Sequence, residues 1–164
     1  MPRLTIREAR REDLDTLVDF NARLALESEN KVLDRQILAR GVAAALAEPD
    51  RLRYWVAVDG SGAVVGQAAI TREWSDWRAG WIWWFQSVYV HPDHRGRGTF
   101  RALHNEIRTT ARSSPDVIGL RLYVEVSNDR AQKVYQSLGM KPGGYDVYEE
   151  LWIAEPGLVE SSDG

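Results

Sequence analysis

Residues 88–101, VYVHPDHRGRGTFR, run from an apolar segment through a proline turn into a loop rich in glycine and arginine. After the loop, apolar side chains recur at the spacing of one helix face, at Phe100, Leu103, Ile107 and Ala111. The loop therefore joins a predicted strand to the start of a predicted helix. Backbone N–H groups at a helix start bind anions, and the arginines add positive charge. The stretch predicts a site for a pyrophosphate group.

The spacing of the glycines separates this loop from other phosphate-binding loops. A Walker loop needs G-x-x-x-x-G-K-[ST], which the sequence lacks. A dinucleotide fingerprint needs G-x-G-x-x-G, but Gly96-Arg97-Gly98 is followed by Thr99-Phe100-Arg101 without a third glycine. The pattern that fits is R-x-x-G, from Arg95 to Gly98, directly before the helix.

Composition limits the class of protein. The chain has 164 residues, which suits one domain, and it is 44% hydrophobic, enough for a sizeable core. Its formal net charge of −3 argues against a nucleic-acid binder. Between positions 91 and 112, however, there are five arginines against two acidic residues, namely Arg95, Arg97, Arg101, Arg108 and Arg112 against Asp93 and Glu106. This local excess of positive charge indicates a specific anion site.

Several kinds of site are not expected. The chain has no cysteine, which excludes disulfides, thiolate metal sites and a cysteine nucleophile. His91-x-x-His94 lies in a predicted turn without a third ligand at a recognised spacing, and His104 does not supply one, so we expect no metal site. The N-terminus lacks an apolar signal segment and no apolar run reaches membrane-spanning length, so we expect a soluble cytoplasmic protein without a membrane partner.

Hydrophobic periodicity and turn signals predict the order β-α-α-β-β-β-α-β-α-β. The expected strands cover 4–7, 54–58, 63–71, 81–90, 120–126 and 147–153. The expected helices cover 12–26, a stretch from Leu33 to before Pro49, 98–112, and a short segment that Asn128 caps and Gly139 ends. The result is a mixed α/β layer fold, with residues 1–154 as a single domain and 155–164 as a loose acidic tail.

A second motif lies one predicted strand after the loop. It is Asn128-x-x-Ala131-x-x-x-Tyr135-x-x-Leu138-Gly139-Met140. This segment resembles the N-x-x-A-x-x-x-Y-x-x-x-G-F/M stretch of the GNAT superfamily of acetyl-CoA-dependent N-acetyltransferases. The R-x-x-G loop is similar to the Q/R-x-x-G-x-G/A loop of the same family. Phe100 departs from the small residue expected at the end of that loop.

The resemblance implies the GNAT fold, a mixed and mostly antiparallel central sheet flanked by helices, and acetyl-CoA as cosubstrate. It implies that the main chain of Val88, Tyr89 and Val90 pairs with the pantetheine arm. The pyrophosphate and the rest of the cofactor would then be held by Arg95, Gly96, Arg97, Gly98, Thr99, Phe100, Arg101, Asn128 and Ala131. Because a phenylalanine ring must turn aside from a bound pyrophosphate, we expect either a shifted helix start or a ring packed on the core.

In the family, an acceptor amine attacks the thioester directly in a ternary complex. Tyr135 matches the general acid that protonates the leaving thiolate. The alternative is a core tyrosine in the apolar stripe of Ala131, Val134 and Leu138. Glu125 is our candidate for the general base, with Glu27, Glu29 or a chain of waters as alternatives, and each of these carboxylates is also typical of a solvated surface.

Five tryptophans lie within eleven residues, at positions 74, 77, 81, 83 and 84. They are typical of a strand buried on both faces, and some of them would suit an aromatic wall for a cationic acceptor. Gln86 is either a polar contact for a ligand or a buried amide. Two other functions stay open, a non-catalytic acyl-CoA-binding module and, less favoured by the charge and the tryptophans, a nucleic-acid binder. Dimers are common in the family, so a homodimer is also expected.

Overall fold

The computed structural model describes residues 3–152 and 158–160. At its centre lies a sheet whose strands run side by side in the order β1 (Thr5–Glu8), β3 (Arg53–Val58), β4 (Val64–Ser75), β5 (Gly80–Phe85) and β7 (Val117–Leu122), with β6 (Tyr89–Val90) also paired to β4. Neighbouring strands are antiparallel except β5 and β7, which are parallel. The mixed, mostly antiparallel sheet predicted from the sequence is confirmed.

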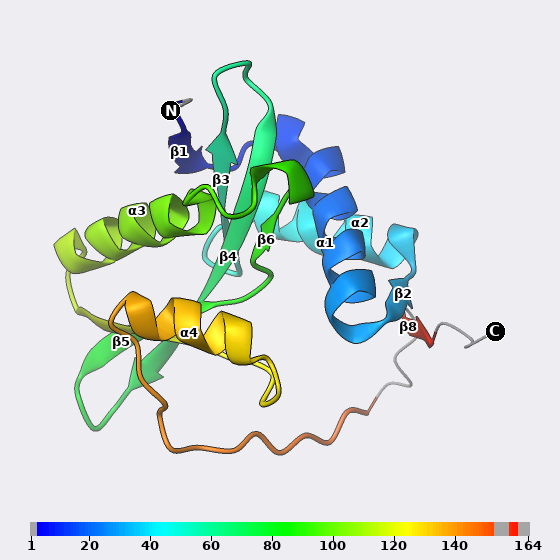
Figure 1. Cartoon of the computed structure of the whole chain (residues 1–164). Helices are drawn as coiled ribbons and strands as arrows, with labels where there is room; N and C mark the ends of the chain where they lie inside the picture. Colours follow the sequence, from blue (N-terminus) through cyan, green and yellow to red (C-terminus); the bar gives the residue numbers. More distant parts are fainter. Residues whose placement is uncertain (1–2, 153–157, 161–164) are drawn as a thin grey trace.

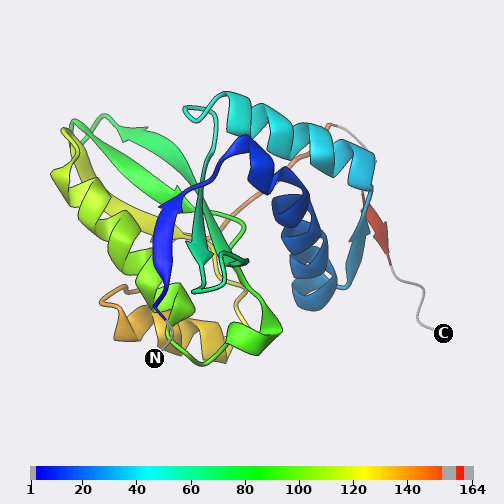
Figure 2. The same cartoon turned by 90° about the horizontal axis from the view of Figure 1, so that it is seen from above.

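Helices cover both faces of this sheet (Figures 1 and 2). On one face lie α1 (Leu14–Glu29), which follows a 3₁₀ turn at Arg11–Asp13, and α2 (Arg35–Ala47). On the other lies α3 (Thr99–Ser113), which follows a 3₁₀ turn at Pro92–His94, with the short α4 (Asp129–Ser137) beside it. The chain thus forms three layers, with the sheet in the middle.

Strand alternation divides the core between the two faces. Along β3, Trp55 and Ala57 pack toward α3, whereas Tyr54 and Val56 pack toward α1 and α2. Successive side chains of a strand point to opposite faces, so one strand serves both clusters. Leu103 and Ile107 of α3 are completely buried in the first cluster, as the helical spacing of the sequence predicts. This burial fixes α3 against the sheet.

Two predicted strands have different bounds in the structure. The strand predicted at 81–90 is broken between β5 and β6, because residues 86–88 leave the regular ladder. The strand predicted at 120–126 is β7, which lies earlier and ends at Leu122. Apolar composition marks both segments as buried, but it does not show where a neighbouring strand ends.

The C-terminal region differs most from the prediction. Residues 147–152 form no strand, and Ile153 lies outside the described residues. An alternating pattern favours a strand, but a strand forms only where another strand pairs with it. Instead, Lys31–Leu33 (β2) pairs antiparallel with Leu158–Glu160 (β8), which lies within the segment predicted as a loose tail. Three-residue strands are too short to show a period in the sequence.

No helix among the described residues has the length and apolar character that crossing a membrane requires.

Candidate functional site

The sheet divides where β5 and β7 stop pairing. Their parallel register runs to Phe85 opposite Leu122. Beyond Phe85 the chain continues from β5 into β6, which also pairs with β4. Beyond Leu122, residues 123–126 pair with no strand among the described residues. The edge of β6 that faces away from β4 also has no strand partner in this part of the structure. Residues 86–90 and residues 123–126 therefore diverge, and the backbone edge of β6 is open on the side between them. We call the space between these two segments the gap.

A buried glutamine supports the irregular backbone between β5 and β6. Gln67 of β4 is completely buried, and its Nε2 donates a hydrogen bond of 3.0 Å to the carbonyl oxygen of Ser87. The backbone N–H of Gln86 still donates to the carbonyl of Ala69, at 2.7 Å. The Gln67 side chain thus replaces a ladder bond at the point where the strand shifts. Our sequence reasoning missed Gln67, and the available signal was a lone polar side chain inside an otherwise apolar strand.

The glycine loop closes one end of the gap and begins α3. Gly96 and Gly98 have φ of 70° and 80°, in the left-handed region that glycine adopts without strain. Thr99 is buried, and its Oγ1 donates 3.0 Å to the carbonyl oxygen of His94, which fixes the turn. No backbone N–H from Gly96 to Arg101 has a hydrogen-bond partner among the described residues. Free donors at the positive end of a helix form an anion site.

The arginine that opens the loop is bonded to α1. Arg95 donates from Nε to the carbonyl oxygen of Val90 at 2.9 Å and from NH2 to Glu27 at 2.6 Å. Its guanidinium also lies over the ring of Tyr89, 5.2 Å from the centroid, and the Tyr89 hydroxyl donates 3.0 Å to Glu27. Arg95 therefore connects the loop, β6 and α1, whereas Arg97 has no partner in the described part of the chain and is exposed.

These contacts set the pKa values of the two groups that Arg95 touches. Burial alone would raise the pKa of Glu27, but the hydrogen bonds from Arg95 and Tyr89 outweigh it and hold that pKa below its ordinary value. Burial, together with the neighbouring Glu27 carboxylate, raises the pKa of Tyr89. Glu27 is thus an ionised anchor for the loop, and its oxygens are already engaged by Arg95 and Tyr89. That engagement makes Glu27 a weaker candidate for the general base.

Phe100 packs its ring on the core. The ring lies 6.2 Å from that of Phe85 and 6.1 Å from that of His104, and α3 begins at Thr99. Of the two outcomes expected for a large residue here, the packed ring is the one the structure contains. On its other side the ring of Phe100 meets that of Tyr135 edge-on, at 5.8 Å. Phe100 therefore joins α3 to α4.

The second motif forms the other side of the gap. Asn128 accepts a 3.1 Å hydrogen bond from the backbone N–H of Ala131, so the predicted cap of α4 is confirmed. Tyr135 is half-buried, and burial raises the pKa of its hydroxyl, which donates no hydrogen bond to the described residues. No residue of α4 is fully buried. The helix therefore presents Tyr135 on its packed side with the hydroxyl uncommitted.

The acidic candidates and Gln86 make no hydrogen bond to Tyr135 in the described structure. Glu125 is exposed and accepts hydrogen bonds from the backbone N–H and the hydroxyl of Ser127. Glu29 is likewise exposed. Gln86 is exposed as well and donates 2.8 Å to Thr71, so its interpretation as a buried amide is wrong.

An aromatic and charged group lies on the β5–β7 part of the sheet. The Trp84 and Tyr123 rings are 4.5 Å apart, and Trp84 Nε1 donates 3.1 Å to Glu73. Arg121 also donates to Glu73, at 2.9 Å. Of the other tryptophans, Trp83 is buried, but Trp77 is 86% exposed, so burial on both faces does not hold for the whole cluster. Within the described ranges, no three acidic or histidine side chains come together as a metal site would require.

The comparisons with known proteins match this geometry. The model of the acetyltransferase (GNAT) family matches residues 14–140, which span the gap, the loop and both motifs. The chain belongs to the GNAT acetyltransferase family. Membership supports acyl transfer as the general activity of this chain. No curated protein matches the sequence significantly.

Solved structures show the same fold. A "possible acetyltransferase" from Clostridium difficile 630 is 43% identical, with a TM-score of 0.85 over 92% of this chain and 98% of that one. A "probable acetyltransferase" is 20% identical, with a TM-score of 0.79 over 92% and 98% of the two chains. An aminoglycoside N-acetyltransferase, AAC(6′)-Iy, in complex with CoA is 16% identical, with a TM-score of 0.71 over 93% and 97%. At the last two identities the likeness concerns the fold alone.

Proposed function

We propose that this GNAT chain is an acetyl-CoA-dependent N-acetyltransferase that acetylates a primary amine by direct attack in a ternary complex. The observation that carries the proposal is the run of N–H groups from Gly96 to Arg101 that have no partner among the described residues, beside the edge of β6 that no described strand covers. The loop N–H groups suit a pyrophosphate, and the edge of β6 suits the amide-bearing pantetheine arm. The structure of a family member with CoA supports the same cosubstrate.

In this proposal the two sides of the gap contact different parts of the cofactor. The main chain of Val88, Tyr89 and Val90 pairs with the pantetheine amides. Loop residues 95–101 hold the pyrophosphate through main-chain donors, and the exposed Arg97 and Arg101 add charge-assisted bonds. Ala131 and the cap at Asn128 place the start of α4 against the other side of the arm.

The transfer forms a C–N bond and breaks a C–S bond. The amine loses a proton to a base, and the sulfur of CoA gains one from an acid. Tyr135 is the acid in this proposal, because it stands at the matching position of the second motif and its protonated hydroxyl donates no hydrogen bond to the described residues. For the base, Glu125 or a chain of waters stays a prediction, as does a cytoplasmic location. We also propose that residues 1–154 act as one domain.

The test is release of free CoA thiol from acetyl-CoA across a broad panel of amines. With a reactive amine, Tyr135→Phe should lower kcat about 10²- to 10⁴-fold, because a positioned acid contributes that much. The affinity for CoA, measured by calorimetry, should stay the same. The matched control is Tyr148→Phe, which removes a hydroxyl from an exposed tyrosine and should leave kcat unchanged.

Two outcomes would contradict parts of the proposal. Saturating CoA that neither binds nor raises the melting temperature would contradict the cofactor site. Firm binding of CoA without turnover of any amine would instead indicate a non-catalytic acyl-CoA-binding module.

A further inference from the structure

Phe100 is the residue at which the glycine loop departs from the small residue expected at the end of its motif, and its side chain has a defined place in the structure. The ring meets that of Tyr135 in α4 edge-on, with the centroids 5.8 Å apart and the planes at 76°. Aromatic rings prefer this arrangement at centroid distances of about 4.5–7 Å. The contact joins the loop that we propose for the pyrophosphate to the residue that we propose as the acid.

The ring of Phe100 is held from behind by two buried rings. Phe85, at the end of β5, and His104, one turn further along α3, are each 2% exposed. They stack on each other at 5.6 Å with their planes at 14°. Phe100 lies 6.2 Å from the ring of Phe85 and 6.1 Å from that of His104. Because side chains in a closely packed core have little room to change rotamer, these two rings fix that of Phe100 against the sheet.

The backbone of Phe100 is fixed as well. Before it, the buried Thr99 is bonded through its hydroxyl to the carbonyl oxygen of His94. After it, the N–H of Ala102 donates 2.9 Å to the carbonyl oxygen of Gly98, which closes the first turn of α3. The main chain and the ring of Phe100 are therefore both set by contacts that do not involve α4.

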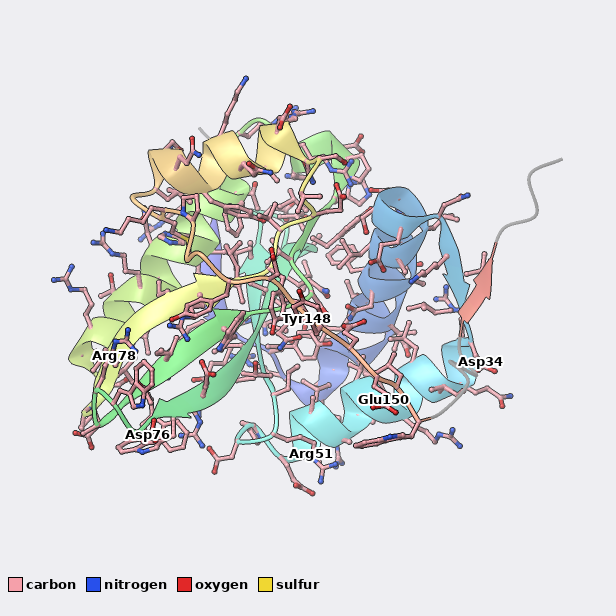
Figure 3. The ribbon with its side chains drawn as sticks, turned by 90° about the horizontal axis from the view of Figure 1, so that it is seen from below. Asp34, Arg51, Asp76, Arg78, Tyr148 and Glu150 are labelled. Carbon is pink, nitrogen blue, oxygen red and sulfur yellow. The ribbon has the colours of Figure 1, made fainter. Side chains whose placement is uncertain are left out.

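By contrast, α4 has little else to hold it in place. None of its residues is fully buried. Within the described part of the chain, one hydrogen bond joins it to α3, from Arg101 to the hydroxyl of Ser137. Both side chains are exposed, and the distance of 3.5 Å makes the bond a weak one. The segment that follows α4 runs on across the molecule, with Tyr148 and Glu150 along it (Figure 3).

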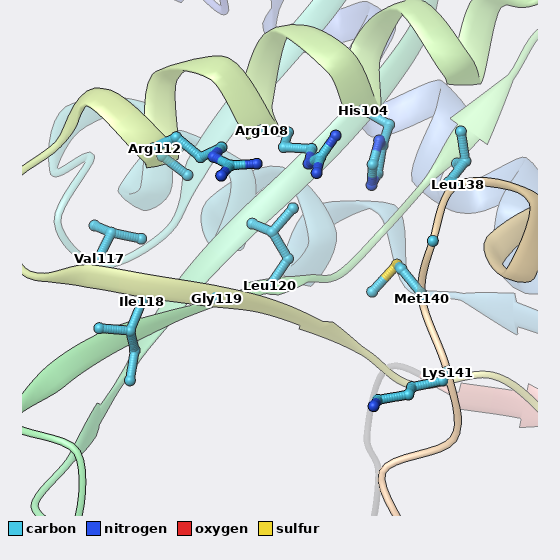
Figure 4. A pocket seen from close by; sticks show the side chains of 12 residues that line it. His104, Arg108, Arg112, Val117, Ile118, Gly119, Leu120, Leu138, Met140 and Lys141 are labelled. Atoms are coloured by element: carbon cyan, nitrogen blue, oxygen red, sulfur yellow. The ribbon is translucent and has the colours of Figure 1, made fainter.

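A cavity separates the rest of α3 from the chain that ends α4. It has a volume of about 620 Å³, and Figure 4 shows His104 lining it from α3, with Leu138 and Met140 on the other side. Atoms that border an open space have no contacts across it. Ring packing between α3 and α4 thus rests on Phe100 and Tyr135.

The hydroxyl of Tyr135 depends on this packing for its direction. It donates no hydrogen bond to the described residues, so no polar contact fixes it. Ring and hydroxyl are one rigid group, and whatever orients the ring also orients the hydroxyl. A general acid must lie within hydrogen-bond reach of its target, and an error of about 1 Å can cost a factor of about 10² in rate.

We propose that Phe100 is a positioning residue for Tyr135. Its ring, fixed by Phe85 and His104, holds the ring of Tyr135 edge-on and so keeps the hydroxyl at one place in the gap. This inference rests on the proposed role of Tyr135 as the acid. Phe100 exchanges no proton itself, and its effect on the reaction passes through Tyr135.

The packing is testable by NMR without any turnover. Protein with ¹³C in its tyrosine rings gives signals from six tyrosines, and the signal that disappears in Tyr135→Phe belongs to Tyr135. A neighbouring aromatic ring shifts such a signal. Phe100→Leu should therefore move the Tyr135 signal toward that of a fully exposed tyrosine such as Tyr148. A Tyr135 signal that stays in place would overturn the proposal.

A double-mutant cycle tests the effect on the reaction. Phe100→Leu keeps an apolar side chain but removes the ring, and it should lower kcat about 10- to 100-fold through misplacement of the acid. In the Tyr135→Phe background the same substitution should have no further effect on kcat, because the hydroxyl that it misplaces is gone. Equal losses in the two backgrounds would show that Phe100 acts on the loop instead, and would overturn the proposal.

The remaining variants separate this inference from the proposed function. Ile107→Val, the matched control, trims a completely buried side chain of the same helix and should leave kcat unchanged. If Tyr135→Phe lowers kcat and Phe100→Leu does not, the positioning role is wrong and the acid stands. If Tyr135→Phe leaves kcat unchanged, the assignment of the acid is wrong, and the positioning role fails with it.

Discussion

The two sides of the gap are built differently. On the first side, residues 86–113 form β6, the glycine loop and α3, with Leu103 and Ile107 at 0% exposure and Thr99 at 2%. On the second side, residues 123–137 lead into and form α4, in which no residue is fully buried. The backbone donors that we propose for the pyrophosphate thus rest on the main core, whereas Tyr135 rests on a helix held at the surface.

This difference indicates that the two sides respond differently to a bound cofactor. Main-chain donors fixed by a buried helix do not need to be ordered when a phosphate arrives, which favours binding. α4 contacts the core side through the ring of Phe100 and a 3.5 Å hydrogen bond from Arg101 to Ser137. A helix held by few contacts gains order from a bound ligand, so we expect the cofactor to stabilise α4 more than α3.

The largest expected effect comes from weakening the first side. Leu103→Ala should lower the free energy of unfolding by about 2–5 kcal/mol, because it opens a cavity in a closely packed core. Val134→Ala in α4, where the side chain is 41% exposed, should cost less than about 1 kcal/mol. Urea unfolding of both variants measures the contrast. Equal losses would show that the two sides are equally well packed.

A smaller effect concerns pH and the buried imidazole of α3. Burial, with a further contribution from the nearby Arg108 and Arg101, lowers the pKa of His104 below its ordinary value of 6.5. As the pH falls through that value, the unfolded chain takes up a proton that the folded chain does not. The free energy of unfolding should therefore fall below pH 6.5, by at most about 1.4 kcal/mol per pH unit from this group.

Comparison of variants isolates this contribution of His104. In His104→Met the dependence of urea unfolding on pH should be shallower, because methionine does not titrate. His91 and His94 are unchanged in the variant and contribute equally to both proteins. An identical pH dependence in the two proteins would show that His104 is protonated as readily in the fold as in the unfolded chain.

The smallest expected effect tests the second side. Asn128→Ala removes the cap of α4, which is worth about 1 kcal/mol, and should speed amide hydrogen exchange in α4 roughly fivefold. The amides of α3 should be unaffected, since α3 has its own start at Gly98. Asn128→Asp keeps an acceptor oxygen and should exchange like the unmodified protein. Unchanged exchange in Asn128→Ala would mean that packing, not the cap, holds α4.

Much of this architecture could be predicted from local sequence. The spacing of Leu103, Ile107 and Ala111 predicts α3 and its buried face, because helix geometry repeats within a few residues. The glycine positions predict the turn that begins α3, and Asn128 predicts the start of α4, since both depend on hydrogen bonds to near neighbours. These elements could be located before any tertiary contact was known.

Other features were decided only by the tertiary structure, because they depend on contacts between residues far apart in the chain. Glu27 and Arg95 meet across 68 positions, and Gln67 and Ser87 across 20. The point where β5 and β7 part and the pairing of β2 with β8 are likewise set by which edges the rest of the fold leaves open. Local patterns specify what a segment prefers, but pairing and burial depend on the partner that the whole chain brings to it.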